Sequence, residues 1–246
     1  MALTTLETFQ SFINKPQTIV VVATAPLPTS TDICWYKFKT SDVTGSSVYN
    51  WATSSTVSSV LYGSPVATNG LITLGTGKYI NLPTVNLSPI PPNGFTISMW
   101  INISTSEAGN CTMFCVGNNN SYNNGIPYSI IYASSSNCYL TTVIGGGGTG
   151  GAQSASYPAT HCFDGNWHLH TLVLPFGGSV AKCYYDGVLW GSPNISALAN
   201  ESTSTAGLLA WGPWYINAGF SDIRMYNTAL SVAQVGSLFT TGRITV

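Results

Sequence analysis

Residues 163–191 read FDGNWHLHTLVLPFGGSVAKCYYDGVLWG, and this stretch decides the fold. The Asp-Gly pair at 186–187 lies between two mostly apolar runs. In that setting it predicts a two-residue hairpin turn of type I′, because both central positions need positive φ angles. A second Asp-Gly pair at 164–165 marks an earlier turn, and a strand-like run follows it over 167–174. The stretch therefore predicts antiparallel strands joined by tight turns.

Short β-rich runs separated by Gly, Pro and Asn occupy most of the chain from residue 32 onward. Such spacing is typical of a sandwich or barrel, so we predict an all-β domain. One short helix is expected over 231–239, because Ser231 is a favourable N-cap residue. The predicted strands are Leu71–Leu74, Tyr79–Leu82, Phe95–Ile103, Thr112–Val116, Tyr128–Tyr132, Tyr139–Ile144, His168–Leu174, Ala181–Tyr185 and Ile216–Tyr226.

The first 30 residues differ from the rest. Thr4-x-x-Glu7 has capping-box spacing and predicts a short helix over about 5–14, whereas QTIVVVA at 17–23 predicts a strand. We interpret residues 1–30 as an N-terminal arm and residues 31–246 as the domain. The arm docks on a partner or packs back on its own sandwich, and both alternatives stay open. Its start lacks the basic and apolar blocks of a classical signal peptide.

Six motifs follow one another along the domain. They are CWYKF at 34–38, GKYINLP at 77–83, FTISMWI at 95–101, DGNWH at 164–168, YYDGV at 184–188 and DIRMYNTALS at 222–231. In this order they resemble the laminin-G-like branch of the concanavalin A-like lectin/glucanase superfamily over about residues 32–240. The resemblance implies a jelly-roll β-sandwich of two antiparallel sheets. Residues 1–30 lie outside it, so the expected fold is this sandwich with a short N-terminal helix/strand arm and a short C-terminal helix.

The motif residues are expected to be structural. Trp167 is expected to fill the core between the sheets, as aromatic residues often do. Asp222 and Arg224 lie two positions apart on a strand, so both point to one face, and we expect them to pair and brace the closing helix. The full set of structural motif residues is Asp164, Trp167, His168, Asp186, Gly187, Asp222 and Arg224.

Metal binding is the alternative role for the histidines. His168 and His170 share one strand face, and His161 lies nearby in the sequence. With Asp164 they have the residue types of a zinc or copper site. We expect structural histidines instead, and no metal. Calcium requires six to eight oxygen ligands, usually with several carboxylates. The carboxylates that remain are far apart in the sequence, so calcium is unsupported and no cofactor is predicted.

The acidic residues argue against catalysis. A retaining glycosidase needs two carboxyl groups roughly 5 Å apart. The chain has eight Asp and Glu residues in all, and no two of them lie two or four positions apart on one predicted strand. We therefore predict that the protein is not an enzyme. A divergent polysaccharide hydrolase or lyase is the last alternative.

Aromatic residues in predicted loops form the candidate ligand surface. Stacking of a sugar ring needs such aromatic side chains with polar groups nearby. Packing against the core or a partner is the alternative role for the same residues. The candidate ligand-binding residues are Trp190, Trp211, Trp214, Tyr215 and Tyr122.

Composition bears on the partners. Only 6% of the residues are charged, and the seven Lys and Arg are scattered singly, which argues against nucleic-acid binding. No apolar run approaches the roughly 20 residues of a membrane span.

The low content of charged residues also bears on protein partners, because protein interfaces are poor in Lys and Glu. We therefore predict a structural or adhesion module of a virion or extracellular surface, such as a minor capsid protein of a large DNA virus. Its partners would be other subunits, which it meets through residues 1–30 and this low-charge surface. A carbohydrate-binding lectin domain is the alternative.

Overall fold

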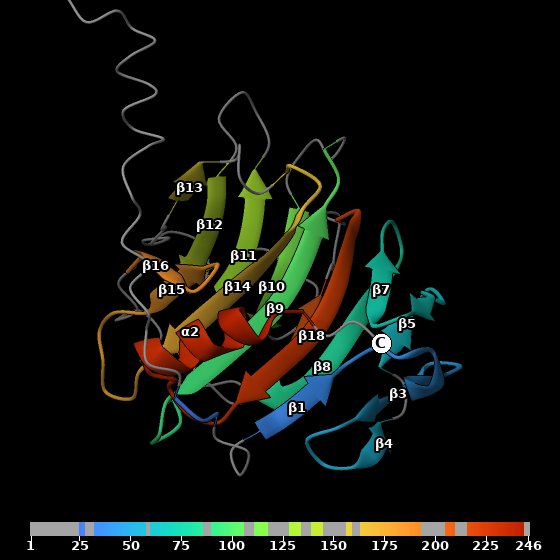
Figure 1. Cartoon of the computed structure of the whole chain (residues 1–246), viewed down its shortest axis with the longest axis horizontal. Helices are drawn as coiled ribbons and strands as arrows, with labels where there is room; N and C mark the ends of the chain where they lie inside the picture. Colours follow the sequence, from blue (N-terminus) through green and yellow to red (C-terminus); the bar gives the residue numbers. More distant parts are fainter. Residues whose placement is uncertain are drawn as a thin grey trace, which may run out of the picture.

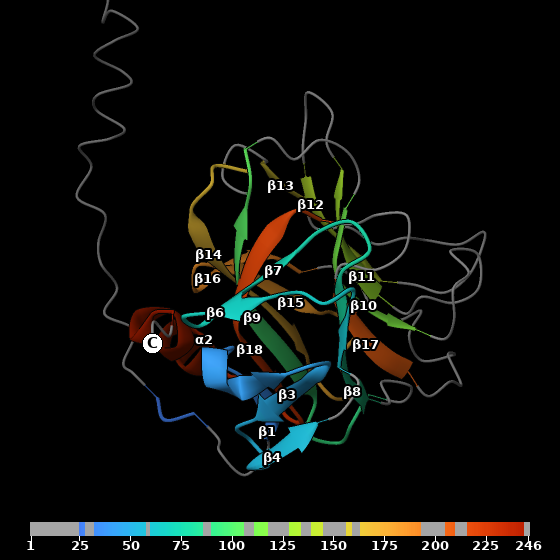
Figure 2. The ribbon, with the colours of Figure 1, turned by 90° about the vertical axis from the view of Figure 1, so that its right-hand side faces the viewer.

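Two large antiparallel sheets stack face to face, and a third, small sheet lies beside β1 (Figures 1 and 2). The computed structural model describes residues 25–27, 32–57, 60–85, 90–105, 111–117, 128–133, 139–144, 156–158, 163–192, 205–209 and 216–243. Every strand pairing in these residues is antiparallel. The predicted all-β sandwich is thus confirmed, with the small third sheet as an addition that the sequence did not predict.

The first large sheet has the strand order β16-β15-β14-β9-β18-β7-β6, and β1 also pairs with β18. Its strands are β16 (Val188–Gly191), β15 (Lys182–Tyr185), β14 (Trp167–Leu174), β9 (Phe95–Ile103), β18 (Ala218–Tyr226), β7 (Leu71–Leu74), β6 (Ala67–Thr68) and β1 (Asp32–Tyr36). Sequence neighbours β14, β15 and β16 are also spatial neighbours, as short turns require.

The second large sheet has the order β13-β12-β11-β10-β17-β8-β5. Its strands are β13 (Ser156–Pro158), β12 (Tyr139–Ile144), β11 (Tyr128–Ala133), β10 (Cys111–Gly117), β17 (Thr205–Leu209), β8 (Tyr79–Val85) and β5 (Leu61–Tyr62). The small sheet contains β2 (Val43–Thr44), β3 (Ser47–Asn50) and β4 (Ser55–Val57), and a short 3-10 helix, η1 (Thr40–Asp42), precedes it.

The nine predicted strands all occur, with bounds that differ from the prediction by no more than a few residues. The hairpin turn between β15 and β16 also has the predicted geometry. Asp186 has φ 49° and Gly187 has φ 78°, and Tyr185 pairs with Val188 across the turn. Two successive positive φ angles are the requirement of a type I′ turn, and they explain why Asp-Gly occupies it.

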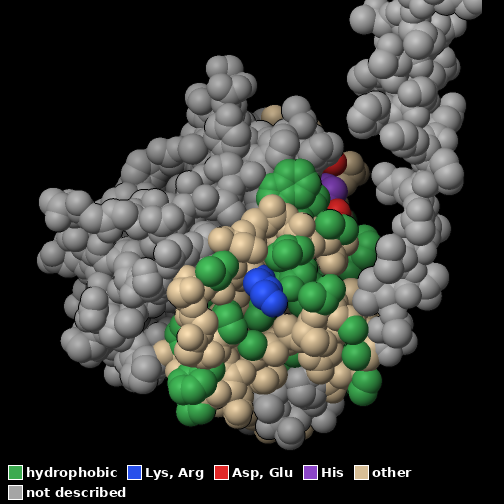
Figure 3. All heavy atoms as spheres, turned by 90° about the vertical axis from the view of Figure 1, so that its left-hand side faces the viewer, with side chains coloured by type: hydrophobic (Ala, Val, Ile, Leu, Met, Phe, Trp, Pro, Cys, Tyr) green, Lys and Arg blue, Asp and Glu red, His purple; other side chains and the backbone are tan. Residues whose placement is uncertain are grey.

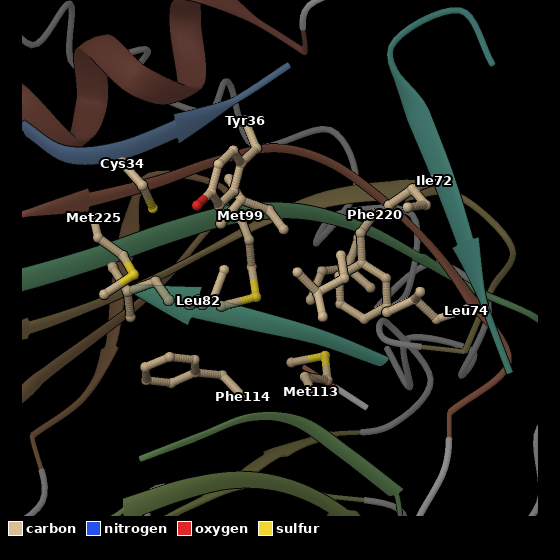
Figure 4. Close-up of a cluster of buried hydrophobic side chains, with 14 of the residues drawn as sticks. Cys34, Tyr36, Ile72, Leu74, Leu82, Met99, Met113, Phe114, Phe220 and Met225 are labelled. Carbon is tan, nitrogen blue, oxygen red and sulfur yellow. The ribbon is translucent and has the colours of Figure 1, made fainter. Parts of the chain in front are cut away.

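The main core lies between the two large sheets. The first sheet contributes Ile97, Met99 and Phe220, and the second contributes Met113 and Phe114, all fully buried. Figure 4 shows Met99 and Phe220 on one side of this core and Met113 and Phe114 on the other. Side chains alternate between the two faces of a strand, so the odd-numbered positions of β9 supply this core.

A second apolar cluster covers the outer face of the first sheet. It contains Trp100 and Leu169 from the sheet, and Val235 and Leu238 from the helix α2 (Val232–Thr241). The helix matches the predicted one closely. Ser231 caps its N-terminus and forms a capping box with a glutamine three residues later. The first sheet is therefore buried on both faces, by the second sheet and by this helix.

Residues 25–27 lie against α2. The Ala25 amide donates to Ser237 Oγ at 3.0 Å, and Ser237 Oγ in turn donates to the Ala25 carbonyl at 3.0 Å. Leu27 packs against the second cluster. This part of the predicted arm thus contacts its own domain. The predicted helix at 5–14 and strand at 17–23 lie outside the described residues. Within the described part of the chain, no helix is long and apolar enough to cross a membrane.

Candidate functional site

His168 stands between two carboxylates. Its Nδ1 lies 2.8 Å from Asp186 Oδ2, and its Nε2 lies 3.2 Å from both oxygens of Asp164. Asp186 also accepts a hydrogen bond from the Leu169 amide at 2.8 Å. The ring stacks on Tyr185, with 4.7 Å between the centroids. These contacts tie the 163–166 bend and the β15–β16 turn to strand β14, which gives both Asp-Gly motifs one shared structural anchor.

The charges of this triad set its ionisation. Burial disfavours the protonated form of His168, but hydrogen bonds and charge from Asp186 and Asp164 outweigh it and raise its pKa above the usual range. For Asp164, burial is outweighed by hydrogen bonds from Asn166 and His168, which lower its pKa. His170, on the same strand, is buried, and this burial lowers its pKa to about 3. The pKa values of the two histidines are therefore shifted in opposite directions, upward for His168 and downward for His170.

This geometry favours a structural role for His168 over a role as a metal ligand, since each of its ring nitrogens lies within hydrogen-bond distance of a carboxylate oxygen. The described residues contain no group of three or more His, Cys, Asp or Glu that could hold a metal ion. His161, the remaining histidine, lies outside the described residues.

Trp167 requires a correction. It was expected in the core between the sheets, but it packs against the second cluster, on the outer face of the first sheet. Its ring lies close to the Gly219 backbone, and the Arg243 guanidinium lies 4.4 Å from the ring centroid. The expectation failed because both faces of β14 are covered by apolar clusters. An apolar side chain on this strand can therefore pack against an apolar cluster whichever face it points to.

Asp222 and Arg224 pair as expected, but with a different third partner. Arg224 Nε donates to Asp222 Oδ1 at 2.9 Å, and Nη2 donates to Oδ2 at 3.1 Å. The Trp35 indole also donates to Asp222 Oδ1, at 2.6 Å, and the Arg224 guanidinium lies 4.1 Å from the Trp35 centroid. The expected brace of the closing helix is thus corrected to a brace between β18 and β1.

The Trp35 side of this brace leads to a group of side chains that we call the Trp–Lys cluster: Trp35, Lys37, Lys39 and Trp51. The Lys37 ammonium lies 3.8 Å from the Trp35 centroid and 3.7 Å from that of Trp51. The Lys39 ammonium lies 5.0 Å from the Trp51 centroid. Each indole is held by its N–H, Trp35 by Asp222 and Trp51 by Asp42 Oδ2 at 2.9 Å. Carboxylates thus orient both rings, and the rings orient the lysines.

The cluster concentrates positive charge. Burial, together with repulsion from Lys39 and Arg224, lowers the pKa of Lys37, and attraction from Asp222 and Asp42 offsets only part of this. Among the described residues, no ion pair involves Lys37 or Lys39. Neither ammonium group therefore has a carboxylate at ion-pair distance among the side chains that the structure describes.

Part of this cluster follows from the alternation of side chains along residues 33–39. Burial alternates along residues 33–39, where positions 34, 36 and 38 are buried and positions 33, 35, 37 and 39 are only partly so. Trp35 and Lys37 thus follow the spacing that places side chains on one face of an extended segment, whereas Phe38, with φ 55°, interrupts the extended backbone before Lys39. Trp51, by contrast, reaches them only through the β3 strand, so its contribution could not be predicted without the fold.

The other candidate surface is the outer strand of the first sheet, which we call the β16 edge: Val188, Leu189 and Trp190. Their exposed fractions are 64%, 47% and 42%. Among the described strands, β16 has β15 as its one neighbour. Phe239 of α2 lies next to Gly187 at the start of this strand. Figure 3 shows this side of the molecule, where hydrophobic side chains form several patches and charged ones are few.

Trp190 is the predicted ligand residue that the structure places, and it lies on this exposed strand. The other four, Trp211, Trp214, Tyr215 and Tyr122, lie outside the described residues.

The described carboxylates all have structural partners. Asp164 and Asp186 bind His168, Asp222 binds Arg224, and Asp42 binds Trp51. The acidic side chains of residues 7, 32, 107 and 201 lie outside the described set.

The fold and motifs agree with a known family. A laminin-G-type family model, described as the concanavalin A-like lectin/glucanases superfamily, matches residues 74–236. The chain belongs to this superfamily. The match contains the DGNWH, YYDGV and DIRMY motifs, including the carboxylate–histidine triad. No curated protein sequence matches the chain.

Solved structures of similar fold include toxin domains and a sialidase. The receptor-binding domain of botulinum neurotoxin C/D mosaic serotype is 15% identical, with a TM-score of 0.61 over 87% of this chain and 52% of that one. The botulinum neurotoxin DC binding domain in complex with rat synaptotagmin II is 16% identical, with a TM-score of 0.62 and the same coverage. Trypanosoma rangeli sialidase is 15% identical, with a TM-score of 0.62 over 95% of this chain and 38% of that one. The chain thus spans about half of each toxin domain and less of the sialidase, and at these identities the likeness concerns the fold.

Proposed function

We propose that the chain is a non-enzymatic structural or adhesion module that joins a larger assembly through the β16 edge. The observation that carries this proposal is the exposure of Val188, Leu189 and Trp190 on the last strand of the first sheet. Successive side chains of a strand point to opposite faces of its sheet. Exposure of all three therefore leaves both faces of this apolar strand accessible to a partner.

An exposed apolar edge strand favours pairing with a strand of another chain. In such recognition the backbone supplies affinity and the alternating side chains supply specificity. The partner we propose is a second copy of the chain, which would supply residues 17–23, QTIVVVA. β-Branched residues of this kind favour strands. The segment precedes Ala25, which is bound to α2, and α2 contacts the start of β16 through Phe239.

Composition and fold support the same proposal. Charged residues make up 6% of the chain, so its surface is poor in them. Buried protein interfaces are similarly depleted in Lys and Glu. Domains of similar fold include one in complex with rat synaptotagmin II, a protein, and one in complex with SialylT. Domains of this fold therefore occur in complexes with at least two different partner molecules. The structural partners of the described carboxylates support the non-enzymatic part of the proposal. The place of the chain in a virion stays a prediction from composition.

A carbohydrate-binding lectin domain is the second candidate, because an exposed Trp such as Trp190 suits stacking on a sugar. Oligomeric state separates the two candidates. We expect the full chain to form dimers or larger species in light scattering at micromolar concentration. Leu189→Lys, which places a charge on the edge, and deletion of residues 1–24 should each yield monomers. Val232→Lys is the matched control, because it adds the same charge at an exposed apolar position of α2.

A full chain that stays monomeric at every concentration would contradict the assembly proposal, as would an oligomer that Leu189→Lys leaves intact. Glycan binding by such a monomer, lost on Trp190→Ala, would establish the lectin function instead. Turnover of a polysaccharide that is lost with a single Asp substitution would point to the enzyme alternative.

A further inference from the structure

The Trp–Lys cluster lies far from the β16 edge. β16 ends one side of the first sheet, whereas β1 and the small sheet that carry the cluster lie toward its other side (Figures 1 and 2). Lys37 and Lys39 of the cluster, together with the neighbouring Arg224, make up three of the seven Lys and Arg residues of the chain. In a protein with so few charges, this concentration needs an explanation of its own.

Packing alone does not account for the two lysines. Arg224 is neutralised by Asp222 in a two-pronged ion pair within β18, and the Trp35 indole N–H joins β1 to that pair, so this hydrogen-bonded link does not involve either lysine. Lys37 and Lys39 add no further ion pair within the described residues. Instead they bring two like charges to within 5.0 Å of one ring centroid, that of Trp51. Such repulsion is a cost to the free protein that an anion would remove.

The cluster is also prepared for a ligand. Long lysine side chains normally lose conformational entropy when they bind, and this loss weakens affinity. Here the Lys37 ammonium is already held between two indoles, which attract cations through their π faces. Those indoles are fixed in turn by hydrogen bonds to Asp222 and Asp42. An anion would therefore meet ordered donors.

We propose that the Trp–Lys cluster is a binding site for a saccharide that carries an acidic group. The oxyanion would accept hydrogen bonds from the ammonium groups of Lys37 and Lys39. The sugar ring would lie against the edge of the indoles and the exposed residues Thr40 and Ser41, whose helical turn ends at Asp42. The residues around the charges are thus aromatic or hydroxylated, which suits a sugar.

The number of cations limits the ligand. Two available ammonium groups can neutralise one or two anionic groups, and Arg224 is already paired. Nucleic acids bind through many phosphate contacts, and an acidic membrane surface likewise needs several basic residues. A single carboxylate, sulfate or phosphate on a sugar fits this charge. These three sources share one chemistry, and the test below separates them.

A glycan array that contains neutral, carboxylated, sulfated and phosphorylated saccharides is the first measurement, with the full chain as the probe. We expect acidic saccharides to bind. Calorimetry then compares the strongest binder with its neutral counterpart, with inorganic sulfate and with inorganic phosphate. Loss of the acidic group should weaken binding about tenfold or more, since a hydrogen bond to a charged group contributes about 1.5–3 kcal/mol. The preferred acidic group identifies the source.

Lys37→Gln and Lys39→Gln should each weaken binding by about tenfold or more. Lys37→Arg, which keeps the charge, should retain most of it. Lys78→Gln is the matched control, since it removes the same charge outside the cluster. The inference is overturned if no acidic saccharide binds, if the neutral counterpart or the inorganic anion binds equally well, or if Lys37→Gln binds as the wild type does. None of these variants touches the β16 edge, so the oligomeric state should not change and the two proposals can fail separately.

Discussion

Asp222→Asn tests the brace between β18 and β1. Asp222 accepts three hydrogen bonds, two from the Arg224 guanidinium and one from the Trp35 indole. The exposed fractions of the two paired side chains are 4% for Asp222 and 9% for Arg224. Removing one partner of a buried ion pair leaves the other charge without compensation, which costs about 3–5 kcal/mol. Asparagine keeps the shape and one acceptor, so we expect a loss near 3 kcal/mol, at the lower end of that range.

The backbone at this position provides an internal control. Asp222 has φ 46°, in the left-handed region that asparagine and aspartate tolerate better than other side chains. Asp222→Asn therefore reports the lost charge, whereas Asp222→Ala adds a backbone cost of about 1–2 kcal/mol. The difference between the two variants separates electrostatics from conformation.

The free energy of unfolding, from urea titration followed by tryptophan fluorescence, measures both losses. The double variant Asp222→Asn, Arg224→Met removes both charges at once and should recover a large part of the loss, because no charge is left buried. A loss below 1 kcal/mol for Asp222→Asn would refute the argument that this pair is coupled in the interior. A double variant whose loss relative to wild type equals the sum of the losses of Asp222→Asn and Arg224→Met would refute it as well.

Three further changes should have measurable effects. The folded-state pKa of His168 is raised, so the stability that its protonated ring contributes is fully present below the unfolded pKa of about 6.5. This contribution is lost as the pH rises through the folded-state pKa. Urea unfolding at a series of pH values should show a smaller loss of stability on the alkaline side for His168→Gln than for the wild type. The acid-side loss should persist, because His170, with a pKa of about 3, stays neutral in the fold while the unfolded chain takes up a proton. Gly187→Ala should lower stability by about 1–2 kcal/mol in urea unfolding, since the residue has φ 78° and the added Cβ would lie 3.1 Å from the Phe239 Cβ. Phe114→Ala, in the core between the sheets, should cost about 3–5 kcal/mol by calorimetric unfolding, and a loss under 1 kcal/mol would contradict its placement.

The fold was predictable because its signals are local. Asp186-Gly187 specifies its own turn through φ angles, and Ser231 specifies the start of α2 through its hydroxyl. The very short strands of the small sheet have no such signal. β2 has two residues, too few to show a strand pattern of its own, and it pairs with β3 at Val43–Val48 and Thr44–Ser47. Short elements of this kind form because the surrounding fold provides a partner.

The candidate sites were predictable only in part, because they depend on contacts between distant residues. Lys37 and Lys39 are separated by one residue and Arg224 is distant from both in the sequence, and this scatter predicted a surface without concentrated charge. The fold brings them together, because β1 pairs with β18 and places Trp35 opposite Arg224. Trp167 shows the converse limit. Its apolar character predicted packing against a core, and it is partly buried, but this character could not decide between the two faces of a strand that is covered on both sides.

The two proposed surfaces are more informative together than separately. A site with two available ammonium groups can contribute only modest affinity for one acidic group, a few kcal/mol at most. An assembly through the β16 edge would place several Trp–Lys clusters on one particle, and simultaneous engagement of several sites can raise overall avidity by about 10²–10⁴ without any new contact. The positions of the two surfaces permit this, because the sheet edge that would join subunits is not the side that carries the cluster. Adhesion by weak sites that are multiplied through assembly would therefore explain why a chain with so few charges holds three of its seven cations in one place.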